Sequence, residues 1–191
     1  MKQQEKPKLG FALCGSFCTF DKVFSVMETL SDYDLTVIMS PSVFSSDTRF
    51  GRAADFIRHA EAISGKKVLY ECKETEPFGP KKTLDMLLVA PCTGNTLAKL
   101  AAGIADTSVT LAAKAHLRNS RPLIIAPSTN DGLAGNAKNI GQLLNMKNVY
   151  FVPFRQDDPE QKPRSVVADM EKIPQTLLYA AQGKQIQPIL L

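Results

Sequence analysis

Hydroxyl and amide side chains gather where an apolar run gives way to an alanine-rich segment, in LVAPCTGNTLAKLAAGIAD (residues 88–106). The apolar run is typical of a β-strand, and the alanine-rich segment is typical of an α-helix. Thr93, Asn95 and Thr96 therefore stand at the start of a helix, where several backbone N–H groups also lack partners. Because one such side chain is enough to cap a helix, the three together favour a bound ligand at this strand end.

Two further strand ends carry similar groups. In CGSFCTF (residues 14–20), Gly15 permits a tight turn and Ser16 offers a hydroxyl and an N–H group near a helix start, which suits a phosphate. A plain strand-to-helix turn explains the same pair. In SPSVFSSDT (residues 40–48), Ser40 and Ser42 are candidate ligand contacts, and a solvated turn is the alternative.

Several other kinds of site are not indicated. Neither the G-x-G-x-x-G dinucleotide fingerprint nor the Walker phosphate loop is present. The cysteines form no C-x-x-C pair and the two histidines stand far from them, so we predict reduced thiols and no metal site. No residue has a pattern that assigns it a catalytic role. His59 has two interpretations, a substrate contact beside Arg58 or a residue on a helix surface. The cysteines are Cys14, Cys18, Cys72 and Cys92.

The elements that must position these groups alternate along the chain. Compact apolar runs predict strands at residues 8–14, 35–40, 85–90, 122–127 and 149–154, with a weaker one at 67–72. Helical patterns cover residues 20–30, 49–63, 93–105, 109–117 and 137–145. This alternation predicts an α/β fold, a Rossmann-like three-layer, doubly wound parallel sheet with helices on both faces. In such sheets, ligands bind at the carboxyl ends of the strands.

Length and charge limit the remaining possibilities. The 191 residues predict one domain over 1–191, with a core at about 8–154, a charged mobile loop at 155–164 and a last helix at about 165–182. The net charge of +4 is unclustered, which argues against a nucleic-acid partner but leaves a small acidic ligand open. No signal peptide or long apolar stretch occurs, so we expect a cytoplasmic protein without membrane contact.

Three segments carry a resemblance to a known family. The stretch LLVAPCTGNTLAKLAAGIADTSVTLAAKA is similar to the PASANT region of the flavoprotein family that includes the flavin-containing cysteine decarboxylases, with CTGNT in place of ASANT. GFALCGSF near the start and RPLIIAPSTN later extend the similarity over about residues 8–154.

The resemblance implies a flavin domain, assembled as a homo-oligomer built on trimers, with FMN at a subunit interface. Carried over by position, the residues that would contact FMN come from three strand ends. They are Gly15, Ser16, Phe17, Ser40, Ser42, Cys92, Thr93, Asn95 and Thr96.

The sequence departs from the decarboxylase pattern at two places. Those enzymes carry a histidine at the position that falls near Pro77, where this chain has none. Their P-x-M-N-x-x-M-W substrate clamp is reduced here to Pro127 and Asn130, with Thr129 in place of methionine and no tryptophan. Asn130 remains a candidate substrate contact, and an Asx turn before Gly132 is the alternative.

The segment APSTNDGLAGNAKNIGQLL and the C-terminal run resemble one branch of the family. That branch implies a chain that works with a nicotinamide-binding partner in oxidising dihydrodipicolinate, a small dicarboxylate, to dipicolinate during sporulation. NAD(P) would lie on the partner, because this chain lacks a dinucleotide fingerprint. The alternatives are an independent FMN-dependent decarboxylase and a non-catalytic assembly protein with a vestigial flavin pocket. Lys81, Lys82 and the arginines of residues 155–164 either steer the dicarboxylate or are simply solvated.

Overall fold

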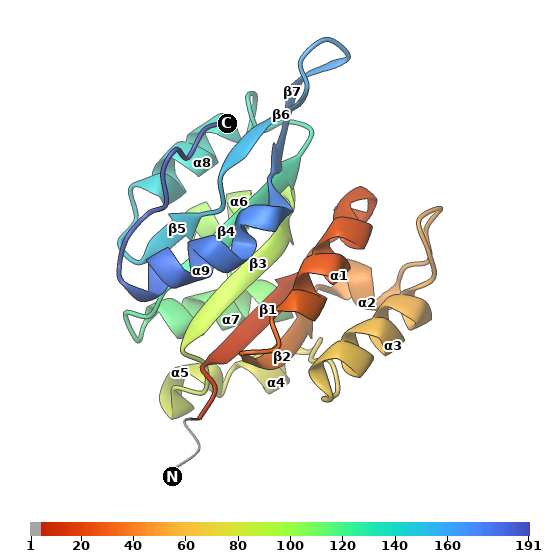
Figure 1. The fold of residues 1–191 in the computed structure, drawn as a ribbon, viewed down its shortest axis with the longest axis vertical. Helices are drawn as coiled ribbons and strands as arrows, with labels where there is room; N and C mark the ends of the chain where they lie inside the picture. The colour runs from red at the N-terminus through yellow and green to blue at the C-terminus, as the bar shows by residue number, and fades with distance from the viewer. Residues whose placement is uncertain (1–4) are drawn as a thin grey trace.

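A seven-stranded sheet forms the centre of the computed structural model, which describes residues 5–191 (Figure 1). The strand order is β2-β1-β3-β4-β7-β6, and β5 pairs with β4 beside this path. The strands are β1 (Lys8–Leu13), β2 (Asp34–Met39), β3 (Met86–Cys92), β4 (Leu123–Thr129), β5 (Val149–Phe151), β6 (Phe154–Asp158) and β7 (Lys162–Ala168).

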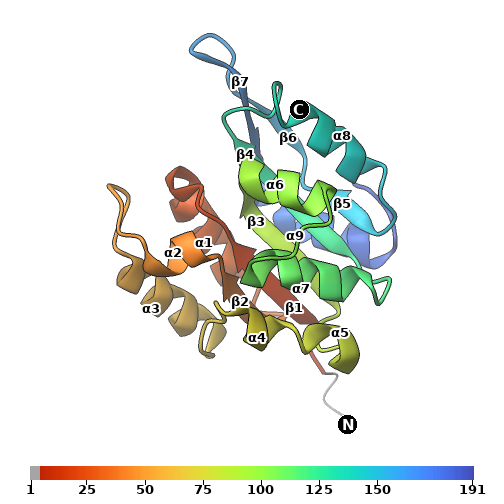
Figure 2. The same ribbon diagram turned by 180° about the vertical axis from the view of Figure 1, so that it is seen from behind.

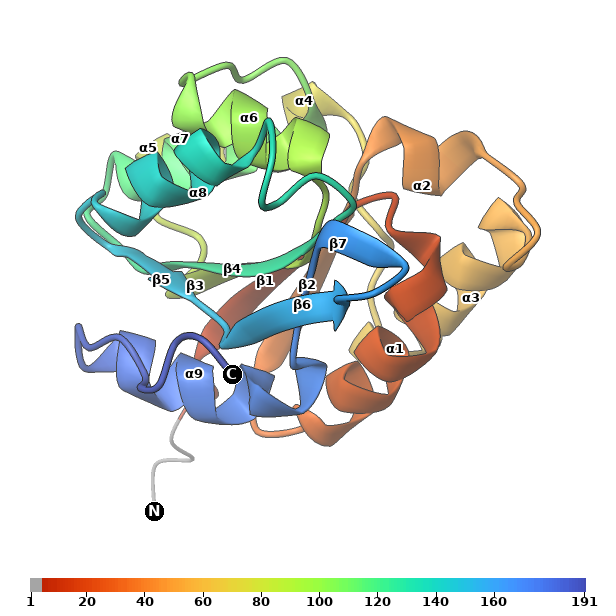
Figure 3. The same cartoon turned by 90° about the horizontal axis from the view of Figure 1, so that it is seen from above.

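Helices cover both faces of this sheet. Figure 3 shows the sheet between two helical layers, with α1 and α9 on one face and α6, α7 and α8 on the other. Figure 2 shows the layer of α6, α7 and α8 in front of the sheet. The helices are α1 (Phe20–Thr29), α2 (Pro41–Ser45), α3 (Ala53–Ser64), α4 (Cys72–Thr75), α5 (Phe78–Lys81), α6 (Gly94–Ala101), α7 (Ser108–Leu117), α8 (Ala137–Leu144) and α9 (Ile173–Ala181), with short 3-10 turns η1 (Phe17–Thr19) and η2 (Met170–Lys172).

The core lies along β1, β3 and β4. Every residue of β3 is buried, and so are all residues of β4 except Thr129. Strands covered on both faces need continuous apolar runs, which is why these segments read as strands in the sequence. β1 to β5 pair in parallel, so the carboxyl ends of the four central strands meet at one edge. The predicted α/β sheet with helices on both faces is confirmed.

The two halves of β4 pair with different strands on the same side. Its first half, through Ile125, pairs in parallel with β5, and Ser128 and Thr129 pair antiparallel with β7. The β6–β7 hairpin thereby continues the sheet beyond the carboxyl ends of the parallel strands, and its tip projects from the body of the molecule in Figure 1.

This hairpin corrects two predictions. Residues 155–164 are not a loop, because most of them belong to the paired strands β6 and β7. The last helix does not begin at residue 165 either. Residues 165–168 complete β7, and α9 starts only at Ile173. The physical reason is long-range, since β7 becomes a strand by pairing with the end of β4.

Smaller differences concern the edge beyond β2. The predicted strand at residues 67–72 is reduced to one bridge between Leu69 and Ile38. The helix predicted from residue 49 starts at Ala53, because residues 48–51 form a tight turn. No helix within residues 5–191 has the length and hydropathy needed to cross a membrane.

The backbone of Gly132, in the loop after β4, packs closely against the Val166 side chain of the hairpin. A Cβ on Gly132 would overlap Val166 Cγ2 and lie 3.1 Å from Val166 Cβ, and Val166 is buried. We therefore expect Gly132→Ala to lower the free energy of unfolding by about 1–3 kcal/mol, because the overpacked contact cannot relax by moving a flexible side chain.

Urea unfolding measures this change. The matched control is Gly141→Ala in α8, where an added Cβ meets nothing within 4 Å. That helix-interior change should stabilise the protein by up to about 1 kcal/mol. Equal effects of the two substitutions would contradict the packing contact.

Candidate functional site

The carboxyl ends of β1, β2, β3 and β4 surround two adjoining cavities. The larger cavity, of about 620 Å³, lies between the β1 end, the start of α6, the loop after β4 and the β6–β7 hairpin. The smaller cavity, of about 390 Å³, lies between the ends of β1 and β2 and the start of α6. Three residues line both cavities, namely Gly15, Thr93 and Asn95. The two cavities therefore form one candidate site.

The start of α6 supplies donors to both cavities. Thr93 is the N-cap, and its hydroxyl accepts a hydrogen bond from the Thr96 backbone N–H at 3.4 Å. Its Oγ1 also lies 3.1 Å from Thr96 Oγ1. The N–H groups of Gly94 and Asn95 belong to the first turn and have no acceptor within the helix. One hydroxyl thus completes the cap, and the Asn95 amide is left exposed at the junction of the cavities.

Serine hydroxyls connect the strand ends. Ser16 Oγ lies 2.7 Å from Ser128 Oγ at the end of β4. Ser40 and Ser42 form a second pair, with their hydroxyls 3.1 Å apart. A Cβ on Gly15 would stand 3.2 Å from Ser42 Oγ, so glycine lets the β1 end approach the second pair closely. The first pair fixes hydroxyl groups at the larger cavity, and the second pair fixes them at the smaller cavity.

Two thiols lie beneath the site. Cys14 and Cys92 are buried, and Thr96 Oγ1 donates to Cys14 Sγ at 3.3 Å. Burial raises the pKa of the Cys14 thiol to about 11, although hydrogen bonds from Thr96 and Thr93 oppose this shift. Burial, with the neighbouring Cys14, also raises the pKa of Cys92 well above its usual value. Both thiols are protonated at neutral pH and are poor nucleophiles.

Sequence reasoning missed a carboxylate network at the larger cavity. Thr129 Oγ1 donates to Asp131 at 2.6 Å, and Asn136 Nδ2 lies 2.8 Å from both carboxylate oxygens. A Cβ on Gly94 would meet Asp131 Oδ1 at 2.7 Å, so this carboxylate sits against the start of α6, where a negative charge is stabilised. The dense Thr, Asn and Asp content of STNDGLAGN was the available signal.

Other missed residues lie on the rim of the larger cavity. Arg49 and Phe50 come from the turn before α3, and Asp157 and Lys162 come from the hairpin. Lys162 Nζ lies 2.8 Å from Asp157 Oδ2, and this hydrogen bond and charge raise the pKa of Lys162. Charged residues in turns usually face solvent, so no local pattern indicated these positions.

Most of the predicted site residues come together. Gly15, Ser16, Phe17, Thr93, Asn95 and Asn130 line the larger cavity, whereas Ser40, Ser42 and Thr96 line the smaller one with Gly15, Thr93 and Asn95. Cys92 is the exception, because its side chain is fully buried with Sγ 3.9 Å from the Thr93 carbonyl oxygen. What these residues bind remains a prediction.

The two histidines have other surroundings. His59 Nε2 lies 3.0 Å from Glu28 Oε1, and its ring stacks on Phe24. His116 Nε2 donates to the Pro122 carbonyl at 2.9 Å, and burial lowers the pKa of His116 to about 4, so its ring is neutral at pH 7. Within residues 5–191, no cluster of three or more His, Cys, Asp or Glu residues could hold a metal ion.

The arrangement suits a ligand that carries both an anionic end and a polar body. Hydroxyls and backbone N–H groups of the smaller cavity can donate to phosphate oxygens. Amide, hydroxyl and charged groups of the larger cavity can orient a polar ring.

Comparisons with known proteins show which chains this one is similar to. The chain is 41% identical over 193 aligned residues to the B subunit of dipicolinate synthase from Bacillus subtilis (strain 168), covering 100% of this chain and 96% of that protein. The crystal structure of the corresponding B subunit from Bacillus halodurans C has a TM-score of 0.89 and 40% identity over 98% of both chains. The FMN-dependent cysteine decarboxylase TvaF from thioviridamide biosynthesis has a TM-score of 0.65 and 21% identity over 93% of this chain and 99% of that one, and it shares the fold.

A family model with the description Flavoprotein matches residues 1–178. Since that match covers most of the chain and a relative is 41% identical along its whole length, the chain belongs to the Flavoprotein family.

Proposed function

We propose that the chain is the FMN-binding B subunit of a dipicolinate synthase, which acts with the A subunit of that enzyme to oxidise dihydrodipicolinate to dipicolinate during sporulation in the cytoplasm. The observation that carries the proposal is the pair of joined cavities at the strand ends. It is found in a chain that is 41% identical to a dipicolinate synthase B subunit. Assembly into a homo-oligomer built on trimers is part of the same proposal.

The described residues fit FMN. Ser40, Ser42 and Thr96 surround the smaller cavity with hydroxyls, and a Cβ on Gly15 would make a tight contact of 3.2 Å with Ser42 Oγ. These groups, with the first N–H groups of α6, would hold the phosphate. Lys99 also lines this cavity, but its ammonium already pairs with Asp106 at 2.8 Å, so the neutral donors would carry most of the phosphate binding.

The larger cavity would take the rest of the cofactor and the substrate. Ser16, Phe17 and Asn95 line it, and Asn130 can donate to a carboxylate of the substrate. When bound, FMN can accept and pass on a pair of electrons. The residues of this chain bind and orient the ring and fix the donors around it.

The reaction requires a second cofactor site. Dihydrodipicolinate becomes aromatic when one hydride passes to NAD(P)⁺, giving NAD(P)H, and one proton is released to solvent. Because this sequence has no dinucleotide fingerprint, we assign the NAD(P) site to the partner, the A subunit. Because the FMN site and the NAD(P) site would lie on different subunits, the activity of this chain would depend on its partner.

FMN uptake is the first test. The purified chain incubated with FMN should gain the visible absorbance of bound flavin after gel filtration. Asn95→Ala should weaken FMN binding by on the order of 1–3 kcal/mol, because it removes an amide at the junction of the cavities. Asn145→Ala, at the exposed end of α8, is the matched control and should bind normally. A chain that stays colourless in excess FMN would leave the vestigial pocket as the better interpretation.

Thiol reactivity gives a second test that needs no catalysis. A thiol reagent should modify the exposed Cys18 and Cys72 and spare the buried, protonated Cys14 and Cys92 until the protein unfolds. Cys18 lines the larger cavity, so bound FMN should slow its modification severalfold and leave Cys72 as the internal control. Peptide mass spectrometry separates the sites. Equal rates at Cys18 with and without FMN would argue against binding in this cavity.

Dependence on the partner is the third test. The nicotinamide-binding partner and this chain, assayed separately for dipicolinate formation by absorbance, should be inactive or nearly so, and the mixture should be active. Asn130→Ala should reduce the activity of the mixture by about tenfold, because it removes a donor to a charged carboxylate. Full activity of the partner alone would remove the catalytic role, and normal stimulation by the variant would restrict this chain to assembly.

A further inference from the structure

A rigid turn presents residues 49 and 50 at the mouth of the larger cavity. Thr48 and Gly51 exchange backbone hydrogen bonds at 2.9 and 3.2 Å, and the Phe50 N–H donates to Thr48 Oγ1 at 3.1 Å. Asp47 Oδ1 accepts from the Ala53 N–H at 2.9 Å, which ties the turn to the start of α3. The turn is therefore fixed by its own hydrogen bonds.

The turn keeps the Phe50 ring outside the core. Gly51 has a φ of +149°, and a Cβ there would lie 2.7 Å from the Phe56 ring. Phe56 in turn packs against Phe17, Phe20 and Phe24, so the space beneath the turn is already filled. Phe50 remains 47% exposed beside a cavity that it lines. The turn therefore holds an exposed apolar ring at the rim, where it is available for stacking.

Arg49 brings a cation to the rim that has no carboxylate partner. Its guanidinium lies 4.8 Å from the centre of the Phe50 ring, and it forms no ion pair with any carboxylate in residues 5–191. The three other charged residues that line the cavity all have partners. Lys162 and Asp157 form an ion pair, and the Asp131 carboxylate keeps its charge but accepts hydrogen bonds from Thr129 and Asn136. An anion that approaches this rim therefore meets the positive charge of Arg49.

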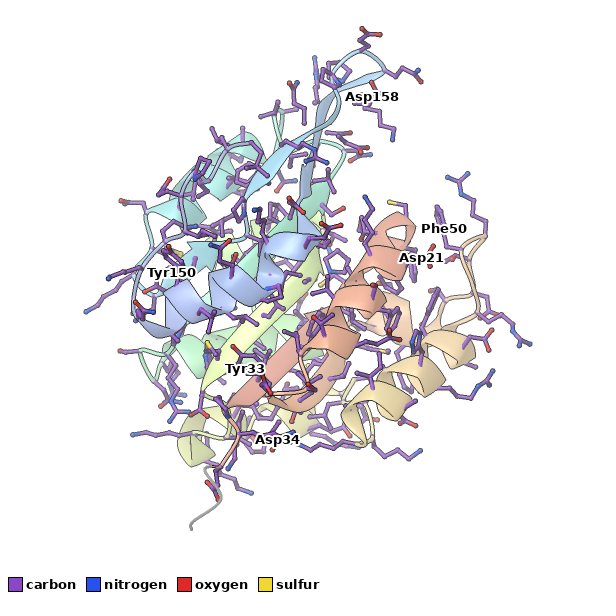
Figure 4. All side chains as sticks on the ribbon, in the orientation of Figure 1. Asp21, Tyr33, Asp34, Phe50, Tyr150 and Asp158 are labelled. Carbon is purple, nitrogen blue, oxygen red and sulfur yellow. The ribbon has the colours of Figure 1, made fainter. Side chains whose placement is uncertain are left out.

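We propose that Arg49 and Phe50 are specificity-determining residues that bind a planar ring bearing a carboxylate, Arg49 through the carboxylate and Phe50 through the ring. The inference rests on the proposed function, since it names the residues of this chain that would recognise the dicarboxylate. A guanidinium matches a carboxylate with two parallel hydrogen bonds, and a ring face favours stacking with another planar ring. Phe50 lines the same cavity as the hairpin residues Asp157 and Lys162, and Figure 4 shows Phe50 and Asp158 in the upper part of the molecule, with Tyr33 and Asp34 below.

Direct binding of dipicolinate, pyridine-2,6-dicarboxylate, to the FMN-treated full chain tests this proposal by calorimetry. Arg49→Ala and Phe50→Ala should each weaken binding roughly tenfold. Arg49→Lys should restore only part of the affinity, because an ammonium lacks the planar fork. Phe50→Leu should retain less affinity than the wild type, because it keeps the apolar area without the ring. FMN uptake should be unchanged in all four variants.

The matched controls are Arg58→Ala, an exposed arginine on α3, and Leu178→Ala, an exposed apolar residue on α9. Both should bind dipicolinate like the wild type. A wild-type chain that fails to bind dipicolinate, or rim variants that bind it normally, would overturn the inference. Loss of FMN uptake in the rim variants would assign the turn to the flavin site instead. If the rim variants bind dipicolinate normally but no longer stimulate dipicolinate formation by the nicotinamide-binding partner, the turn is a docking contact for that partner. Stimulation of the partner by the wild-type chain tests the proposed function separately.

Discussion

Strand β4 changes partners halfway along its length, and the site depends on that change. Through Ile125 it pairs with β5 in the ordinary parallel manner, and from Ser128 it pairs with β7. The switch carries the sheet past the level at which the other strands end, so the larger cavity has a hydrogen-bonded wall where such sheets usually have only loops. Ser128 shows the consequence directly, because it pairs with β7 and also contacts the Ser16 hydroxyl of the β1 end.

The two cavities differ in how they handle charge. The smaller cavity offers mainly hydroxyls and N–H groups, and its cation is already neutralised by Asp106. The rim of the larger cavity carries full charges at exposed positions, where water weakens their interactions. An anion held by neutral donors in the interior loses less when salt is added than one held by exposed cations. The site therefore combines a salt-tolerant end with a salt-sensitive one.

The central strands were predictable because burial on both faces imposes continuous apolar runs, as in MLLVAPC. The hairpin was not, because FRQDD in β6 has one buried residue followed by four polar residues, three of them exposed, and nothing local distinguishes it from a loop. Its strand character comes from pairing with distant residues, which single-sequence propensity does not register. Pro174 in the first turn of α9 was a usable signal for the true helix start.

The site residues were predictable only where local sequence fixes their place in the sheet. Gly15, Thr93 and Asn95 could be predicted because they stand directly after strands, where the direction of the sheet fixes their location. Arg49 could not, since a turn carries it to the cavity through tertiary contacts alone.

In the pairs Ser16–Ser128 and Ser40–Ser42, the serine hydroxyls of the site hydrogen-bond to one another rather than to a ligand. Within residues 5–191, every buried side-chain nitrogen and oxygen has a hydrogen-bond partner. The buried side chains of the protein therefore have partners before a ligand arrives. A ligand that bonds to these hydroxyls must replace the hydrogen bonds within the pairs, and such exchanges gain little net free energy each. The order of assembly that this favours is a finished protein first and an exchangeable ligand second.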